Sequence, residues 1–370
     1  MKSFVEFVRA QPVLVISFTA ALLTMIAVPP DMKYVDYCNF GVLAELFGLM
    51  IAVAGLRSAG IFETLTGFLL KKAGNVRRLS LIFISVCFFT SMVITNDVAL
   101  ITFVPLTILA FAKTGDEKSR IMTIVLETAA ANLGSMMTPF GNPQNLFIYD
   151  KYGLTAGQFI QTMLPVGTVC LVILLLLSLA IPAVPCTAEH EHHRKISGKR
   201  VTVYLLLFAV CIITVFKLLP FWVCAAAAIL TALVFDRGLL LKADYALLTT
   251  FVCFFVFVGN ISRIDAVYSF FSGILAGREI LVSSLLSQVI SNVPAAVMLS
   301  GFTTNGTALL VGVNIGGLGT PIASMASLIS LQLYRVTGTA DSKRYIAVFS
   351  AVNFGMLALL LPLCILFFRH

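Results

Sequence analysis

Polar side chains and helix-breaking residues occur together in two segments of this otherwise apolar chain, 132–145 in the first half and 314–327 in the second. Asn, Thr and Ser side chains, together with backbone groups freed by Gly and Pro, can bind a small ion. Paired interruptions at corresponding places in two halves indicate a transporter binding site. Four positions match at one constant offset: Asn132, Gly134, Thr138 and Pro139 against Asn314, Gly316, Thr320 and Pro321.

Two further polar interruptions precede these segments. Thr95-Asn96-Asp97 interrupts the apolar stretch 79–112, and Ser291-Asn292 interrupts the stretch 279–303. Each stretch has room for two half-length helices, so we predict two re-entrant helical hairpins with an Asn at each tip. Freed backbone groups at membrane depth are tolerated only inside protein or beside a water-filled cavity. We therefore expect the tips and the breaks to converge on one cavity.

The binding site is expected to combine the polar residues of both tips and both breaks. Half-helix N-termini at the breaks favour a small anion, whereas half-helix C-termini present carbonyl groups that suit Na⁺. Because no Lys or Arg lies in the middle of a predicted span, an anion would be weakly held. Asn96, Asn145 and Asn292 are the expected ligands of a Na⁺ ion. The full set of expected site residues is Thr95, Asn96, Asp97, Asn132, Thr138, Asn142, Asn145, Ser291, Asn292, Asn314, Thr320 and Ser324.

Two acidic residues at membrane depth are candidates for coupling transport to a proton or a cation. Asp97 lies at the first tip, and Glu127 precedes Asn132 on the same predicted helix. A buried carboxyl can carry a proton. The alternative for Asp97 is a structural role as the N-cap of a helix over 98–112. Glu45 has no polar company in its apolar run, and we expect it to lie outside the site.

The high hydrophobic content of the chain indicates that it folds within a membrane. Of the 370 residues, 59% are hydrophobic and 11% are charged, and the mean hydropathy is +1.01, whereas about 25% of residues are charged in a soluble domain. Apolar runs such as 169–180 lack the alternation of a barrel strand, so the predicted fold class is an all-α polytopic membrane protein. In addition to the hairpins, spanning helices are predicted at 11–29, 38–56, 121–149, 159–181, 201–217, 219–235, 245–262, 306–335 and 345–367.

The net charge of +8 is explained by basic cytoplasmic loops rather than by nucleic-acid binding. With two re-entrant hairpins and a cytoplasmic N-terminus, most of the 25 Lys and Arg residues fall on the cytoplasmic side, as the positive-inside rule requires. The same arrangement makes the two halves inverted copies. The predicted parts are an N-terminal transmembrane helix plus first repeat at 1–184 (hairpin 79–112, broken helix 121–149), a basic cytoplasmic linker at 185–200, and a linking helix plus second repeat at 201–370 (hairpin 279–303, broken helix 306–335).

Cofactor and enzyme chemistry find little support in the sequence. The eight cysteines contain no CxxC pair, and the His-rich segment 189–193 lies in the linker, so no metal site is predicted there. No cofactor is expected beyond a coupling Na⁺ or H⁺. An intramembrane enzyme is the alternative from another class. However, the segment 317–320 reads Gly-Leu-Gly-Thr, with Thr where an aspartyl protease needs Asp, and the chain has no HExxH motif.

These motifs resemble the ion transporter superfamily, which includes arsenite permeases, citrate and dicarboxylate transporters, and some Na⁺/H⁺ antiporters. The likeness runs from about Asn39 onward, and the tips at 95–97 and 291–294 are most similar to the arsenite-permease branch. Dicarboxylate transporters carry Ser-Asn-Thr at both tips, whereas this chain has Thr-Asn-Asp and Ser-Asn-Val. The resemblance implies a homodimer in which a transport domain moves like an elevator against a scaffold.

The predicted function is secondary active transport of a small inorganic or organic anion across a bacterial inner membrane, coupled to Na⁺ or H⁺. The expected partners are the small ion, the lipid bilayer and a second copy of the chain, with no nucleic acid. A Na⁺/H⁺-antiporter-like cation exchanger is the alternative. The helix N-termini favour the anion, whereas Asp97 and the lack of buried basic residues favour the cation.

Overall fold

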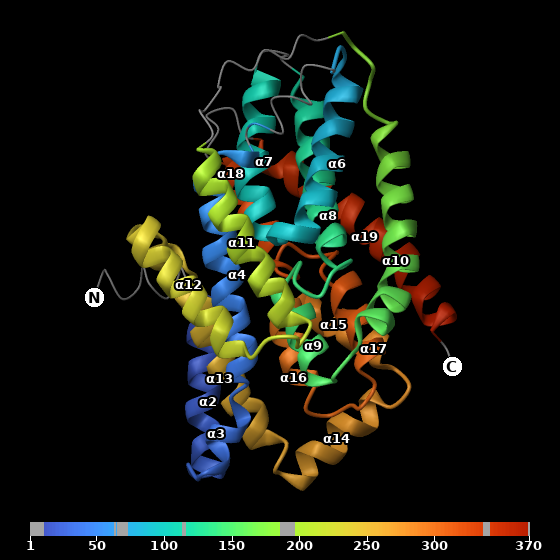
Figure 1. Cartoon of the computed structure of the whole chain (residues 1–370). Helices are drawn as coiled ribbons and strands as arrows, with labels where there is room; N and C mark the ends of the chain where they lie inside the picture. The colour runs from blue at the N-terminus through green and yellow to red at the C-terminus, as the bar shows by residue number, and fades with distance from the viewer. Residues whose placement is uncertain are drawn as a thin grey trace, which may run out of the picture.

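A computed structural model describes residues 11–62, 64, 73–112, 116–185, 197–335 and 341–368. Within these ranges the chain is helical, and one isolated β-bridge joins Asn75 to Pro185 (Figure 1). The helices are α2 (Pro12–Ala27), α3 (Lys33–Tyr37), α4 (Phe40–Ser58), α6 (Val76–Ile94), α7 (Asn96–Ala112), α8 (Glu117–Ser135), α9 (Pro143–Lys151), α10 (Ala156–Ser178), α11 (Gly198–Val215), α12 (Phe221–Phe235), the 3-10 helix η1 (Arg237–Lys242), α13 (Tyr245–Ile261), α14 (Asp265–Leu275), α15 (Glu279–Ile290), α16 (Asn292–Leu299), α17 (Gly306–Ile315), α18 (Met325–Arg335) and α19 (Ser342–Phe367).

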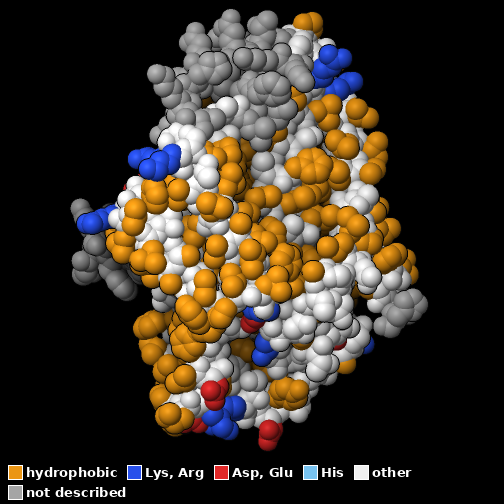
Figure 2. Space-filling model, in the orientation of Figure 1, with side chains coloured by type: hydrophobic (Ala, Val, Ile, Leu, Met, Phe, Trp, Pro, Cys, Tyr) orange, Lys and Arg blue, Asp and Glu red, His pale blue; other side chains and the backbone are white. Residues whose placement is uncertain are grey.

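Among the described helices, α4, α6, α10, α11 and α19 are each long and apolar enough to cross a membrane. α13 and α14 form a sixth such span if they are counted together, although the chain bends by 104° between them. Figure 2 shows hydrophobic side chains over most of the visible face, with charged groups at its margins and in a small group below its centre. A surface this apolar is stable against lipid rather than water. The predicted all-α polytopic membrane protein is confirmed.

Each predicted hairpin stretch contains two helices joined by one residue, although α6, with 19 residues, is long enough to cross a membrane and is not the half-length helix that was predicted. Thr95 (φ 69°, ψ 151°) joins α6 to α7, and Ser291 (φ 75°, ψ 156°) joins α15 to α16. This backbone region is open to Gly but strained for residues with a side chain, at a cost of about 1–3 kcal/mol each. Both tips therefore hold the same strained conformation, although neither is a glycine.

The predicted spans 121–149 and 306–335 are each broken, the first into α8 and α9 and the second into α17 and α18. The two broken helices lie side by side and run in opposite directions. At one end Tyr334 of α18 donates a hydrogen bond to Glu117 of α8. At the other end Tyr152, just after α9, donates to the carbonyl of Thr303, just before α17, at 3.0 Å. The breaks therefore lie at the same level in the molecule.

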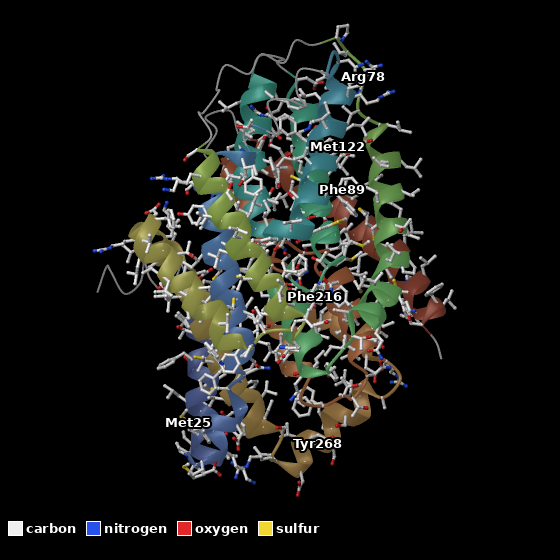
Figure 3. All side chains as sticks on the ribbon, viewed as in Figure 1. Met25, Arg78, Phe89, Met122, Phe216 and Tyr268 are labelled. Atoms are coloured by element: carbon white, nitrogen blue, oxygen red, sulfur yellow. The ribbon has the colours of Figure 1, made fainter. Side chains whose placement is uncertain are left out.

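The hairpins extend toward opposite ends of the protein. In Figure 1, α6 and α7 lie above the breaks, and α15 and α16 lie below them. Figure 3 places Arg78, at the start of α6, at the upper end, and Tyr268 of α14 with Met25 of α2 at the lower end. We call these two ends the Arg78 end and the Tyr268 end.

A second group of helices packs beside the hairpins and breaks. α4 contacts α11 and α12, and α2 contacts α13. A Cβ atom at Gly48 would lie 2.2 Å from Cys224 Sγ, and one at Gly55 would lie 2.2 Å from the Tyr204 ring, so α4 approaches its neighbours more closely than a larger residue permits. We call α2, α4, α11, α12 and α13 the framework helices. α6–α9 and α15–α18 form the hairpin unit.

Short polar side chains begin the broken helices. Asp116 accepts a hydrogen bond from the backbone N–H of Ser119 at 3.1 Å, and Asn305 accepts one from Ala308 at 3.1 Å. Both are N-caps, which satisfy N–H groups that the helix itself leaves unpaired. Of the predicted linker 185–200, the structure describes Pro185 and residues 197–200, and the His-rich segment 189–193 lies outside the described residues.

Candidate functional site

Asn132, near the end of α8, joins the first tip to the second break. Its Oδ1 accepts hydrogen bonds from Asn96 Nδ2 at 3.0 Å and from Ser324 Oγ at 2.8 Å, and all three residues are buried. Its Nδ2 is also buried and has no hydrogen-bond partner among the residues that the structure describes. A buried donor without an acceptor is costly. This amide is therefore suited to donate to a bound ligand.

Asn314, the equivalent residue of α17, joins the two breaks. Its Nδ2 donates to Asn145 Oδ1 at 2.7 Å and to the carbonyl of Leu310 at 2.8 Å. Its Oδ1 accepts from Asn142 Nδ2 at 3.1 Å. Asn142 in turn caps α9, because its Oδ1 accepts from the backbone N–H of Asn145 at 2.9 Å. Both ends of the Asn314 amide are thus bonded, and this residue fixes one break against the other.

Asn145 closes the first break from within. Its Nδ2 lies within hydrogen-bond distance of three backbone carbonyls, those of Thr138 at 2.9 Å, Met136 at 3.2 Å and Ser135 at 3.3 Å. Carbonyls at the C-terminus of a helix lack partners inside the helix. The side chain that the sequence suggested as a Na⁺ ligand therefore stabilises the interrupted backbone of α8 in this structure.

The two Thr residues of the breaks hold the last turns of the two hairpins in a corresponding way. Thr138 Oγ1 donates to the carbonyl of Met92 at 2.5 Å. Thr320 Oγ1 donates to the carbonyl of Gln288 at 2.9 Å. Met92 and Gln288 each lie one turn before their hairpin tip, so both hairpins are attached to their own broken helix at the same point.

The second tip docks directly on the second break. The backbone N–H of Asn292 donates to the carbonyl of Ala323 at 2.9 Å, and Ser291 Oγ donates to the same carbonyl at 3.4 Å. A Cβ atom at Gly317 would lie 3.0 Å from Asn292 Nδ2. The Asn292 amide therefore lies against backbone that only Gly leaves room to approach.

A cavity of about 770 Å³ lies between framework helices α4 and α13 and the hairpin unit. Among the expected site residues, Thr95, Asp97 and Asn142 line it, and its lining also includes the basic residues Arg57 and Lys242. The other expected residues, all of them described, are outside its lining. The cavity thus reaches the first tip and the first break, and it does not include the second tip.

The two coupling candidates lie in different environments. Asp97 is in the first turn of α7, which begins at Asn96, and its buried Oδ1 accepts no hydrogen bond from the described residues. The structure thus shows no capping bond by this oxygen. Glu127 is fully buried away from the cavity, where its Oε1 accepts from Thr107 Oγ1 at 2.7 Å and lies 3.8 Å from Cys87 Sγ. Of the two carboxyls, Asp97 is the one that can meet an ion in the cavity.

Sequence reasoning missed two residues that support the site and misjudged a third. Ser135 accepts from Asn142 Nδ2 at 3.2 Å. Gln288 accepts from the backbone N–H of Thr320 at 2.9 Å and donates to the carbonyl of Gly316 at 2.8 Å. A polar residue one turn before a predicted tip is the signal that could have identified Gln288. The expectation that Glu45 has no polar partner is wrong, because Lys217 Nζ lies 3.0 Å from its Oε1.

The fold and the site together define a polytopic α-helical membrane transporter with interrupted helices at its centre. The sequence matches the family model described as "Citrate transporter" over residues 7–310, and the chain belongs to this family, which is part of the ion transporter superfamily. It is 34% identical over 320 residues to the uncharacterized transporter MJ0456 of Methanocaldococcus jannaschii, covering 84% of this chain and 86% of that protein. It is 30% identical over 303 residues to the inner membrane protein YbiR of Escherichia coli, covering 79% of each.

These relationships confirm that the chain is an integral membrane transporter and not an enzyme. They also confirm the expected superfamily. The alternative of an intramembrane enzyme is thereby removed.

Proposed function

We propose that this protein is a secondary active transporter of a small inorganic or organic anion, coupled to Na⁺ or H⁺. The main support is that both strained tips and both helix breaks are tied into one region of buried Asn, Ser and Thr side chains, which reaches a cavity at Thr95 and Asp97. Irregular backbone at membrane depth is tolerated where it lines a cavity, and such sites bind substrate and coupling ions in transporters.

An anion is favoured by the helix ends that surround the region. α7, α9, α16 and α18 all begin at the tips or breaks, and each N-terminus carries a partial positive charge. The side chains of the cavity lining add no net positive charge, because the basic Arg57 and Lys242 are matched by the acidic Asp97 and Asp244. The unpaired Asn132 Nδ2 supplies a donor for an anionic oxygen. Within the superfamily, the tip sequences support the arsenite-permease-like branch as the finer assignment.

Coupling is assigned to the first tip. Asp97 lines the cavity with a buried carboxylate oxygen that has no partner in the described part of the chain. Such a group is unfavourable as a free charge and gains stability from a proton or a cation. Asn96 lies beside it, so these two residues are the proposed meeting point of Na⁺ or H⁺ with the substrate site. Asn145 and Asn292 are proposed as further Na⁺ ligands in a state other than the one described.

The movement we propose is elevator-like alternating access by two inverted repeats. The antiparallel broken helices and the oppositely directed hairpins support this arrangement (Figure 1). The hairpin unit would be the mobile part and the framework helices the scaffold of a homodimer. We assign the Arg78 end to the cytoplasm of a bacterial cell with this protein in its inner membrane, and with it a cytoplasmic N-terminus, because positive charge concentrates on that side.

A Na⁺/H⁺-exchanger-like activity is the second candidate, favoured by the unpartnered Asp97 oxygen. Uptake by purified protein in proteoliposomes separates the two. The anion transporter should accumulate at least one of citrate, succinate, sulfate, phosphate or arsenite when a Na⁺ or proton gradient is imposed. The exchanger should leave all of these outside but move protons when Na⁺ is added, as reported by an internal pH dye. Protein with Asn132→Ala is the control, and loss of the fluxes in this variant ties them to the site.

A further inference from the structure

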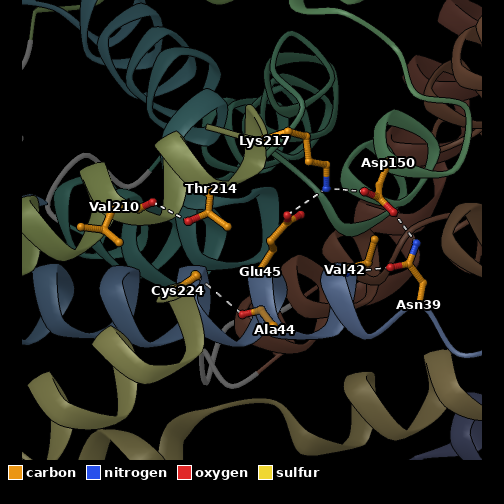
Figure 4. A network of polar contacts seen from close by, with 9 residues as sticks. All are labelled: Asn39, Val42, Ala44, Glu45, Asp150, Val210, Thr214, Lys217 and Cys224. Atoms are coloured by element: carbon orange, nitrogen blue, oxygen red, sulfur yellow. Dashed lines mark hydrogen bonds and ion pairs between the residues drawn. The ribbon is translucent and has the colours of Figure 1, made fainter. Parts of the chain in front are cut away.

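An ion-pair network links the framework helices to the hairpin unit near the beginning of α4 (Figure 4). Lys217 Nζ lies 3.0 Å from Glu45 Oε1 and also pairs with Asp150 Oδ1. The second oxygen of Asp150 accepts a hydrogen bond from Asn39 Nδ2. Asn39 Oδ1 accepts from the backbone N–H of Val42 at 3.0 Å, so this side chain is held by the start of α4.

The four polar residues come from both parts of the protein. Asn39 caps α4, Glu45 lies within α4, and Lys217 lies two residues after the end of α11, so we group these three with the framework helices. Asp150 lies in the last turn of α9, in the hairpin unit. Every polar contact between the two parts in this network therefore passes through Asp150.

The network and the 770 Å³ cavity lie toward different ends of α4. The α4 residues that line the cavity run from Leu46 to Ser58, toward the Arg78 end, whereas Asn39 and Glu45 are at the beginning of the helix. A separate pocket of about 520 Å³ lies beside Asn39, Glu45, Asp150 and Lys217. In the described state the larger cavity thus lies toward the Arg78 end, where Arg57 of α4 also donates to the carbonyl of Ile101 of α7 at 3.3 Å, and the charged bridge lies toward the Tyr268 end.

The backbone supports a special role for Lys217. Among the described residues, those with a side chain and positive φ are Thr95, Ser291 and Lys217. The first two are the hairpin tips, and Lys217 has φ 61° at the end of α11. Gly is the usual residue at such a left-handed helix end, because other residues are strained there. A lysine stands here although glycine would avoid the strain, which indicates that the lysine side chain itself is required at this position.

We propose that Lys217, Glu45, Asp150 and Asn39 form a latch that holds the hairpin unit against the framework helices in the described state and opens when the site faces the other side. The inference rests on the proposed alternating access. Lys217 remains paired with Glu45 when Asp150 departs, so the buried Glu45 carboxylate, which is 1% exposed, keeps its counter-charge throughout. The Lys217 side chain is 50% exposed and that of Asp150 is 17% exposed, so water can replace the contact that breaks. The Lys217–Asp150 ion pair can therefore break without leaving a charged group buried and unpaired.

The latch is tested by measuring how often the covered surface of α4 becomes accessible. Val42 is fully buried in the described state, and a Val42→Cys reporter is introduced into full-length protein whose eight native cysteines are replaced. Reaction with a membrane-impermeant maleimide applied from the Tyr268 end then reports opening. Asp150→Ala should raise the labelling rate about threefold to tenfold, the change expected when about 1 kcal/mol is removed from one state. Lys151→Ala, which alters an exposed neighbour, should leave the rate unchanged.

A second variant separates the latch from loss of folding. Lys217→Met alone would leave Glu45 buried without its counter-charge, so Glu45→Gln is combined with it, and this double variant should accelerate labelling as Asp150→Ala does. Unchanged labelling in both variants overturns the latch. The same is true if labelling rises equally with Lys151→Ala. The labelling measurement needs no substrate. Its result therefore tests the latch independently of whether the proposed anion uptake is observed.

Discussion

The two hairpin tips have nearly the same backbone conformation but carry different side chains. Thr95 and Ser291 hold almost the same strained φ and ψ values, and each is followed by an Asn at the start of a helix. The next residue is Asp97 in the first half and Val293 in the second. The first tip lines the cavity, whereas the second docks on the backbone of its own break. The repeated geometry supplies the shape of the site, and the first half alone adds an ionisable group to its tip.

The same contrast separates the equivalent residues Asn132 and Asn314. Asn132 has a buried Nδ2 without a partner in the described chain, whereas Asn314 is bonded through both ends of its amide. We therefore infer that Asn132 is available for a ligand and that Asn314 is structural. The predictions below test this division, beginning with the largest expected effect.

Alanine at the two equivalent Asn positions should differ in its effect on transport by the folded protein. Asn132→Ala should lower transport by about 10- to 150-fold, the loss expected when a hydrogen bond of about 1.5–3 kcal/mol to a charged group is removed, and it should also lower the melting temperature, because Asn96 Nδ2 and Ser324 Oγ lose their buried acceptor. Asn314→Ala should lower the free energy of unfolding by about 1–3 kcal/mol, because Asn145 Oδ1 loses its donor in a buried site. Proteoliposome uptake and thermal melting of the purified variants measure the two effects. An equal loss of transport by folded protein in both variants would contradict the division.

Removing the charge from the first tip should uncouple transport. Asp97→Asn keeps the size of the side chain but cannot exchange a proton or neutralise a cation, so uptake should lose its dependence on pH and on Na⁺ while the protein still folds. Initial uptake rates across a series of pH values and Na⁺ concentrations provide the measurement. Val293→Ala at the second tip is the matched control and should retain the wild-type dependence. If Asp97→Asn also retains it, Glu127 becomes the candidate.

The attachment of each hairpin to its break should respond differently to alanine. Gln288 holds the second break through its side chain, with bonds to Thr320 and Gly316. Met92 receives the Thr138 hydroxyl on its backbone carbonyl, which alanine retains. Gln288→Ala should lower the free energy of unfolding by about 1–3 kcal/mol. Met92→Ala should lower it by less, since Met92 is only half-buried. Thermal melting in one detergent compares them, and a larger loss for Met92→Ala would refute the assignment.

Glycine at the tips should give the smallest effect. Thr95→Gly and Ser291→Gly relieve about 1–3 kcal/mol of strain each, offset by about 0.5–1 kcal/mol of extra unfolded-state entropy. Each variant should therefore be more stable by about 1 kcal/mol, visible as a slightly higher melting temperature. Lower melting temperatures in both variants would mean that the side chains of Thr95 and Ser291 contribute more than the strain costs.

The sequence by itself determined the helical elements and the composition of the site. Apolar runs too long and too uniform for strands predicted the spans, and the Asn interruptions predicted where α6–α7 and α15–α16 turn, because these signals are local. The repeated Asn, Thr and Pro positions likewise predicted the two breaks. Asn96 and Asn132 could be identified as candidate site residues because a polar side chain inside an apolar membrane segment is energetically costly and therefore indicates a function.

Only the tertiary structure decided which of these groups meet. Asn132 and Asn314 occupy equivalent positions in the sequence, yet within the described ranges only the Asn132 amide has a donor without an acceptor, since the partners of the two residues come from different helices. Glu45 looked isolated because Lys217 and Asp150 are far from it along the chain, and they reach it only through the packing of α4 against α11 and α9. Hydrogen bonds and ion pairs between helices depend on rotation and depth to within an ångström or so, and local sequence patterns do not carry that information.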